Sequence, residues 1–199
     1  MPREHGKKRY PDKPLNDTNP IRILKILDSY LNEPIEVVVY GKAALHLLFQ
    51  NDSGIGVTND VDLIVPEVHV SIFDERLDFW EAMENTNQKL KSEGLYITHV
   101  FDEKQIVLHS TWFNSKLEIG IKGINNLSIF VPSPLDLILT KMMRIDPLDR
   151  EDIRFIYEKA NLDPKVLSEH LKGAVCPEIE EIMEAFEQNK FWLKSEGMT

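Results

Sequence analysis

The residues in this chain best suited to chemistry are two aspartates at alternate positions, Asp60 and Asp62, in the run Thr-Asn-Asp-Val-Asp-Leu-Ile over 58–64. Successive side chains of a strand point to opposite faces, so the two carboxylates would project from one face. Two carboxylates held side by side repel each other unless a cation lies between them. Their oxygens suit Mg²⁺ or Mn²⁺, whose coordination is completed by water and substrate phosphates. The pattern predicts a metal site at this pair.

A strand, a glycine and a helix precede the aspartate pair. Residues 35–40 are Ile-Glu-Val-Val-Val-Tyr, which favours a buried strand; Gly41 ends this run, and a helix is expected over 42–50. Free N–H groups at a helix N-terminus attract phosphate, and glycine allows close approach. We therefore predict that Gly41, Lys42 and Thr58 bind nucleotide. Lys42 either holds a phosphate as a point charge or points to solvent and leaves a damaged phosphate cradle.

The apolar spacing of the chain predicts the elements that must position these residues. Helices are expected over 21–31, 42–50 and 73–93, and strands over 35–40, 61–65, 95–101, 105–109, 116–121 and 127–131. From Pro134 onward the pattern is helical, over 135–145, 149–161, 164–171 and 178–194. This order is typical of an α+β (α/β-like) fold, with a mixed sheet flanked by helices. We divide the chain into a polar basic arm over 1–20, expected to be partly disordered, a core over 21–132 and a helical region over 133–199.

The strand–glycine–helix turn followed by an Asp-x-Asp strand resembles the signature of the nucleotidyltransferase superfamily. The form Thr-x-Asp-Val-Asp-Leu is similar to minimal members related to abortive-infection and toxin–antitoxin nucleotidyltransferases. The runs Ser-Pro-Leu-Asp-Leu-Ile-Leu-Thr-Lys over 133–141 and Asp-Arg-Glu-Asp-Ile over 149–153 resemble their later motifs, a helix-borne lysine and an Asp-x-x-Asp helix. The similarity covers about residues 36–161.

The resemblance implies a nucleotidyltransferase fold and a set of functional residues. It implies catalytic roles for Asp60, Asp62, Lys141 and Asp152, with Mg²⁺ or Mn²⁺ as cofactor and a nucleoside triphosphate (NTP) as substrate. Many members carry a third carboxylate on a later strand. Glu118 has the required apolar–acid–apolar setting, and the alternative is an outward-facing strand glutamate. The expected reaction is metal-dependent transfer of a nucleoside monophosphate to an acceptor, for which RNA is the favoured candidate.

Other functions stay open. One alternative is a catalytically silent binding module or a toxin–antitoxin component with a cognate antitoxin as partner. A kinase-like phosphotransferase is less compatible with the sequence, because no Gly-rich loop and no catalytic-loop Asp…Asn pattern is present.

Charge and composition bear on partners and location. The net charge of −10 argues against a generally basic nucleic-acid surface. The basic residues of the arm, 7–9, could still form a local positive strip for RNA with Lys141 and Arg144. The first thirty residues do not resemble a signal peptide, no apolar run is long enough to span a membrane, and Cys176 is the only cysteine. We therefore expect a cytoplasmic protein without a membrane partner.

Three polar residues receive local interpretations. Asp149 is expected to cap the helix that carries Asp152, since aspartate suits an N-cap and complements the helix dipole. His46 is interpreted as a helix-face histidine. His99 lies on an expected strand, with no partner fixed by the sequence.

Overall fold

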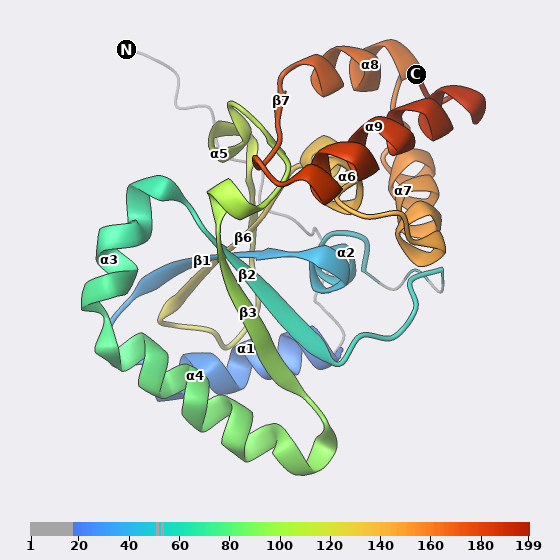
Figure 1. Ribbon diagram of the computed structural model, residues 1–199. Coiled ribbons are helices and arrows are strands. Elements are labelled where there is room, and N and C mark those ends of the chain that lie inside the picture. The colour runs from blue at the N-terminus through green and yellow to red at the C-terminus, as the bar shows by residue number, and fades with distance from the viewer. Residues whose placement is uncertain (1–17, 51, 53) are drawn as a thin grey trace, which may run out of the picture.

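A five-stranded mixed sheet forms the centre of the computed structural model, which describes residues 18–50, 52 and 54–199. The strand order is β3-β2-β1-β6-β5 (Figure 1). The strands are β1 (Ile35–Tyr40), β2 (Asp60–Val65), β3 (Tyr96–Asp102), β5 (Leu117–Ile119) and β6 (Leu127–Val131). The pairs β1–β2 and β5–β6 are antiparallel, whereas β1–β6 and β2–β3 are parallel. The expected fold class, an α+β fold with a mixed sheet flanked by helices, is confirmed.

One face of the sheet packs against helices α1 (Asn19–Tyr30), α2 (Gly41–Leu48) and α4 (Leu77–Leu90). Val37 and Val39 of β1 and Leu63 of β2 point to this face and belong to the main buried core. Alternation along each strand sends the intervening residues to the other face. Asp60 and Asp62 therefore lie on the face that these helices do not cover.

The opposite face is covered by the segment 103–116, which contains α5 (Trp112–Ser115). Val38 and Ile64 pack there with Ile106, Leu108 and Trp112 in a second, smaller apolar cluster. The strand expected over 105–109 is wrong in its extent. Only β4 (Leu108–His109) is extended, and it pairs with β7 (Ala174–Val175) in a separate two-stranded sheet. The alternating apolar side chains of this run pack on the face of the five-stranded sheet. The run itself does not join that sheet as a further strand.

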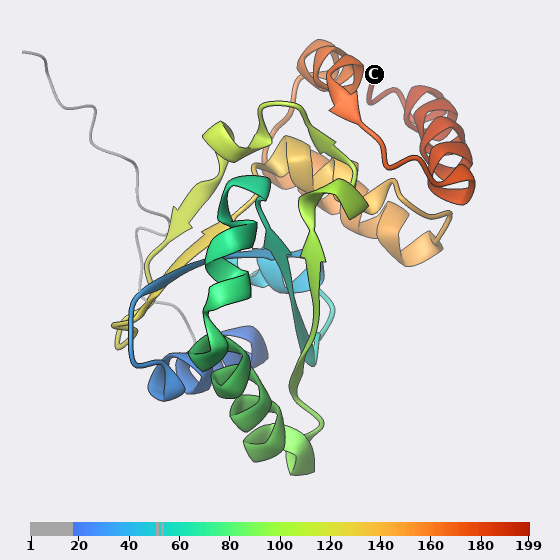
Figure 2. The ribbon, with the colours of Figure 1, turned by 60° about the vertical axis from the view of Figure 1, so that its left-hand side comes forward.

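The chain from Pro134 onward is mainly helical, as expected: α6 (Pro134–Lys141), α7 (Pro147–Lys159), α8 (Pro164–Lys172) and α9 (Glu180–Ser195). These helices gather at one end of the molecule, whereas α1 and α4 lie at the other (Figures 1 and 2). The prediction that Asp149 caps α7 is wrong. The N-cap is Asp146, which accepts a hydrogen bond from the Leu148 N–H and precedes a proline in the first turn. Proline suits that position because its missing N–H has no intrahelical partner there.

The helix expected over 73–93 is interrupted. It consists of α3 (Val70–Glu75) and α4, separated at Arg76, whose guanidinium binds Asp78 and the carbonyl oxygens of Glu33 and Pro34. These tertiary hydrogen bonds stabilise the helix break at Arg76. The sequence gives no local indication of it, because no glycine or proline lies there. Among the described residues, three short 3₁₀ turns add to these elements: η1 (Glu67–His69), η2 (Lys91–Glu93) and η3 (Glu103–Gln105).

The basic residues of the expected arm, 3–13, lie outside the described residues. Within the described part of the chain, no helix combines the length and the apolar composition needed to cross a membrane.

Candidate active site

A cleft of about 390 Å³ opens where β1 ends and β2 begins, between the sheet and helices α6 and α7. Its charged lining comprises Lys42, Asp60, Asp62, Lys141, Arg144, Asp149 and Asp152. The other lining residues are Tyr40, Gly41, Phe101, Thr140, Met143 and Leu148. The cleft brings together residues from the strand–glycine–helix turn, the Asp-x-Asp strand and the later lysine and aspartate motif.

The aspartate pair opens β2, beside the end of β1. Asp62 lies opposite Tyr40 in the antiparallel pairing, and Asp60 lies two residues earlier on the same face. Both side chains line the cleft. The shared face of the two side chains was expected from the alternation of the sequence and is observed, whereas metal binding by the pair stays a prediction.

Gly41 brings the backbone close to this pair. Its φ is +67°, a left-handed conformation that favours glycine, and a Cβ built on it would lie 3.7 Å from Asp62 Oδ2. Helix α2 begins at this residue. The turn therefore leaves space beside one oxygen of Asp62 that a side chain would partly fill.

A threonine hydroxyl holds one oxygen of each aspartate. Thr58 Oγ1 donates to Asp60 Oδ1 at 2.6 Å, and Thr98 Oγ1 donates to Asp62 Oδ1 at 2.5 Å. His99 Nδ1 lies 3.4 Å from the same Asp62 oxygen. Thr58 is buried, its hydroxyl is bonded to Asp60 and it is not part of the cleft lining, so its contact with nucleotide stays a prediction. Sequence reasoning missed Thr98 and left His99 without a partner.

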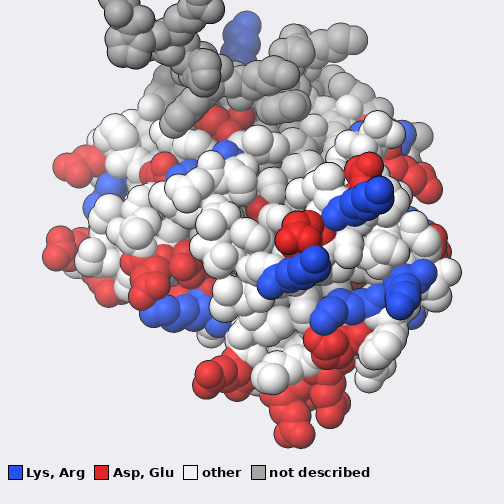
Figure 3. Space-filling view, turned by 90° about the horizontal axis from the view of Figure 1, so that it is seen from above, with Lys and Arg blue, Asp and Glu red and all other residues white. Residues whose placement is uncertain are grey.

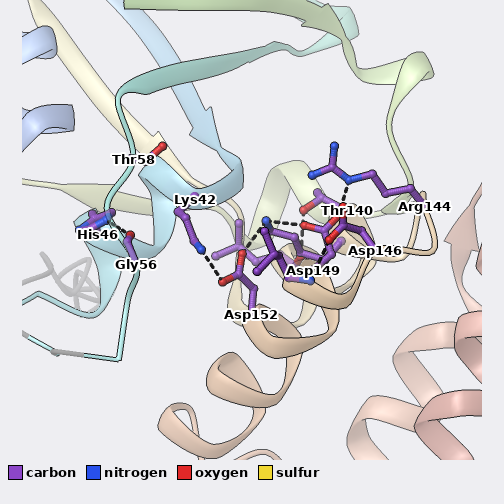
Figure 4. A network of polar contacts seen from close by, with 12 residues as sticks. Lys42, His46, Gly56, Thr58, Thr140, Arg144, Asp146, Asp149 and Asp152 are labelled. Atoms are coloured by element: carbon purple, nitrogen blue, oxygen red, sulfur yellow. Dashed lines mark hydrogen bonds and ion pairs between the residues drawn. The ribbon is translucent and has the colours of Figure 1, made fainter. Parts of the chain in front are cut away.

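The opposite wall of the cleft is a network of ion pairs on α6 and α7 (Figure 4). Lys141 Nζ donates to Asp149 Oδ1 at 2.8 Å and to Asp152 Oδ2 at 2.7 Å. Lys42, from α2, extends toward α7 and lies 3.1 Å from Asp152 Oδ1. Arg144 pairs with the other oxygen of Asp149. Lys42 therefore does not point away into open solvent, because its ammonium group joins the two sides of the cleft, and its contact with a phosphate stays a prediction.

The environment of the cleft shifts the pKa of three lining groups, Asp149, Tyr40 and Arg144, and the hydrogen bond to Asp149 raises the pKa of Arg144. Burial would raise the pKa of Asp149, but hydrogen bonds and charge from Arg144 and Lys141 outweigh it and hold the pKa below its usual value. Burial and the nearby Asp62 carboxylate raise the pKa of the Tyr40 phenol, against an opposing effect of Arg144. Asp149 is therefore ionised at neutral pH, and Tyr40 remains a neutral hydroxyl that can donate a hydrogen bond.

A family model described as a nucleotidyltransferase of unknown function (DUF6036) matches residues 22–194, which include every residue that lines the cleft. The chain belongs to this nucleotidyltransferase family. No curated protein and no solved structure matches it. The superfamily expected from the sequence is thereby confirmed, whereas the comparisons do not support the closer likeness to abortive-infection nucleotidyltransferases.

The structure does not bring Glu118 to the aspartate pair. Glu118 lies on β5, and the strands β6 and β1 separate β5 from β2. At the usual strand spacing this separation is on the order of 14 Å. Strand order depends on long-range pairing, which the apolar–acid–apolar pattern around Glu118 does not encode. On the side of β2 away from β1, the neighbouring strand is β3, which presents Thr98 and His99 to Asp62.

The donor set of the cleft fits a hard divalent cation that keeps part of its water shell. Within the described residues, no three His, Cys, Asp or Glu side chains form a complete ligand set. Asp60 and Asp62 supply two carboxylates, and Mg²⁺ is often held by one or two carboxylates together with substrate phosphates and water. The space beside Gly41 faces the Asp62 oxygen that does not receive the threonine hydrogen bond.

Proposed function

We propose that this protein transfers a nucleoside monophosphate from an NTP to an acceptor hydroxyl, with Asp60 and Asp62 holding Mg²⁺ or Mn²⁺. The observation that supports this proposal most directly is that the aspartate pair lies in one cleft with Lys42, Lys141 and Arg144. The four aspartates and three basic residues of the cleft give it a net charge of −1. A divalent cation reverses that sign, so the cleft then attracts the phosphates of a nucleotide.

The cation and the basic side chains of the cleft have distinct roles in this proposal. The bound cation would neutralise the phosphate oxygens and the charge that develops on the leaving group. The acceptor oxygen bonds to the α-phosphorus, the bond to pyrophosphate breaks, and the hydroxyl proton passes to a cleft carboxylate or to water. Lys42 and Arg144 make the first phosphate contacts, since their side chains are 26% and 70% exposed, against 10% for Lys141. Lys141 can contact a phosphate only after its ion pair with Asp152 breaks.

RNA as the acceptor and a cognate antitoxin as partner remain part of the proposal through resemblance to toxin–antitoxin nucleotidyltransferases. The charge distribution gives RNA little support. Lys141 is buried in ion pairs and cannot contribute to an exposed basic strip. On the described part of the face in Figure 3, basic side chains lie beside acidic ones.

The test is the thermal stability of the full chain with Mg²⁺ or Mn²⁺ and each NTP. Ligand at one hundred times its dissociation constant adds about 2.7 kcal/mol, which raises Tm by on the order of 5 °C. The Asp60→Asn, Asp62→Asn double variant should lose this shift and keep its unliganded Tm, because asparagine oxygens can still accept the threonine hydrogen bonds. Labelled NTPs incubated with total RNA and with cell protein then identify the acceptor.

A matched pair of glycine variants separates backbone strain from ligand binding. Gly41 and Gly94 have φ values of +67° and +66°, but only Gly41 lies near a cleft residue. Gly41→Ala and Gly94→Ala should each destabilise the protein by about 1 kcal/mol. Only Gly41→Ala should reduce the nucleotide-induced shift.

A catalytically silent binding module is the second candidate, and the distance of Glu118 from the aspartate pair favours it. A nucleotide-induced shift without transfer to any acceptor would support this candidate. The absence of any shift in the wild-type protein would refute nucleotide binding at the cleft.

A further inference from the structure

The pairing of β2 with β3 is irregular beside Asp62. Val61 pairs with Ile97 and Leu63 pairs with Val100, so two residues of β3 lie opposite the single residue Asp62. Such a bulge adds one residue to a strand and redirects the side chains next to it. The two residues of β3 opposite Asp62 are Thr98 and His99.

The bulge explains how both side chains reach one carboxylate. In a regular strand, neighbouring side chains point to opposite faces. Here Thr98 Oγ1 and His99 Nδ1 lie 2.5 Å and 3.4 Å from the same atom, Asp62 Oδ1. The imidazole of His99 also packs on Phe101, with ring centroids 5.1 Å apart, and Phe101 contacts Tyr40 edge-on. The contact between His99 and Asp62 is therefore supported by two aromatic residues of the cleft wall, Phe101 and Tyr40.

The hydrogen bonds fix which Asp62 oxygen is available. Oδ1 receives Thr98 and faces His99, whereas Oδ2 lies beside the space left by Gly41. Thr58 holds Asp60 Oδ1 in a similar way. Hydrogen bonds to a ligating carboxylate set its orientation, and their loss typically weakens metal binding by ~10–100-fold.

We propose that Thr98 and His99 are positioning residues that turn Asp62 Oδ2 toward the cation of the cleft. This inference rests on the proposed metal-dependent function. It assigns the support of Asp62 to a hydroxyl and an imidazole on the neighbouring strand β3. Thr98 is the main contact because its distance is 0.9 Å shorter than that of His99.

The experiment measures binding of Mn²⁺ alone to the full chain, by the electron paramagnetic resonance signal of free Mn²⁺. Thr98→Val keeps the shape of the side chain without its donor and should weaken Mn²⁺ binding by about tenfold. Thr98→Ser keeps the donor and should bind within about twofold of wild type. His99→Phe keeps a ring against Phe101 and should weaken binding by about two- to threefold, less than Thr98→Val. Unliganded melting temperatures should match wild type in all three variants.

A double-variant comparison separates positioning from a general structural effect. Thr98→Val should have no further effect on Mn²⁺ binding when Asp62 is already asparagine, and its full effect when Asp60 is asparagine. Equal Mn²⁺ binding by wild type and Thr98→Val overturns the inference and leaves the proposed function standing. A wild-type protein that binds no Mn²⁺ overturns both. Failure of Thr98→Ser to restore binding also overturns the inference.

Discussion

At the residue level, the charge of Asp149 contributes to the stability of the folded protein, because it pairs with two basic side chains of the cleft. Its buried carboxylate accepts from Lys141 and pairs with Arg144, while Asp152 pairs with Lys141 and Lys42. Two neighbouring carboxylates of α7 thus fix the positions of three basic side chains. A basic side chain that is paired with a buried carboxylate loses this favourable interaction when the carboxylate is neutralised.

Asp149→Asn should lower the free energy of unfolding at pH 7 by about 2 kcal/mol, because it removes charge-assisted hydrogen bonds. The pKa of Asp149 is lowered in the folded state from its usual 3.8. Its contribution is therefore present above that value and disappears as the pH falls through the folded-state pKa. Urea unfolding should show a constant difference from wild type between about pH 8 and 5, and a smaller one below about pH 4.

Glu187→Gln is the control, because this exposed glutamate pairs with Lys190 on the surface and should contribute little. A difference between Asp149→Asn and wild type that persisted unchanged to pH 3 would contradict the assigned cause.

At the element level, one side chain of α9 fixes the turn between α6 and α7. Asn189 is 0% exposed, and its amide donates to the carbonyl oxygens of Met142 and Arg144 at 3.1 and 3.0 Å. Its oxygen accepts from Arg150 Nε at 3.1 Å. Because α6 and α7 carry the basic and acidic groups of the cleft wall, a helix distant in sequence sets their spacing.

Asn189→Ala should cost about 2 kcal/mol of stability, since two buried carbonyl groups lose a donor. Asn189→Asp should cost more, because a carboxylate would face the same two carbonyl oxygens. Chemical denaturation measures both, with Ser195→Ala on the same helix as a control expected within about 0.5 kcal/mol of wild type. An Asn189→Asp variant as stable as wild type would show that the amide does not hold the turn.

For the whole molecule, the C-terminal helices complete the core of the sheet domain. One contiguous cluster contains Val37 and Leu63 of the sheet together with residues of α6, α7, α8 and α9: Leu137, Leu139, Ile153, Ile156, Leu167 and Leu193. A unit able to fold alone would need an apolar core of its own. The boundary drawn at residue 133 therefore separates regions of the sequence that share one core.

A fragment ending at residue 132 should not unfold cooperatively, because the missing helices leave part of the core exposed to water. Circular dichroism during urea denaturation of the fragment and of the full chain makes the comparison. The full chain should show one transition, in line with its single main core. A cooperative transition in the fragment would show that residues 133–199 form a separate unit.

Local sequence patterns determined the main parts of the site. Alternation along 60–64 is a property of any strand, so it was enough to place Asp60 and Asp62 on one face, whereas their expected position beside Gly41 followed from the family resemblance. Helical spacing likewise predicted the helical region from Pro134 onward. These predictions succeeded because they depend on backbone geometry over a few residues.

Only the tertiary structure decided which distant groups meet the aspartate pair. Thr98 and Asp62 are 36 residues apart and touch through a bulge in strand pairing, and Lys42 meets Asp152 across the cleft. Glu118 has a suitable local pattern but lies three strands from Asp62 in the sheet order. Strand order, bulges and ion pairs between helices result from packing across the whole chain, and neither side-chain periodicity nor motif spacing specifies them.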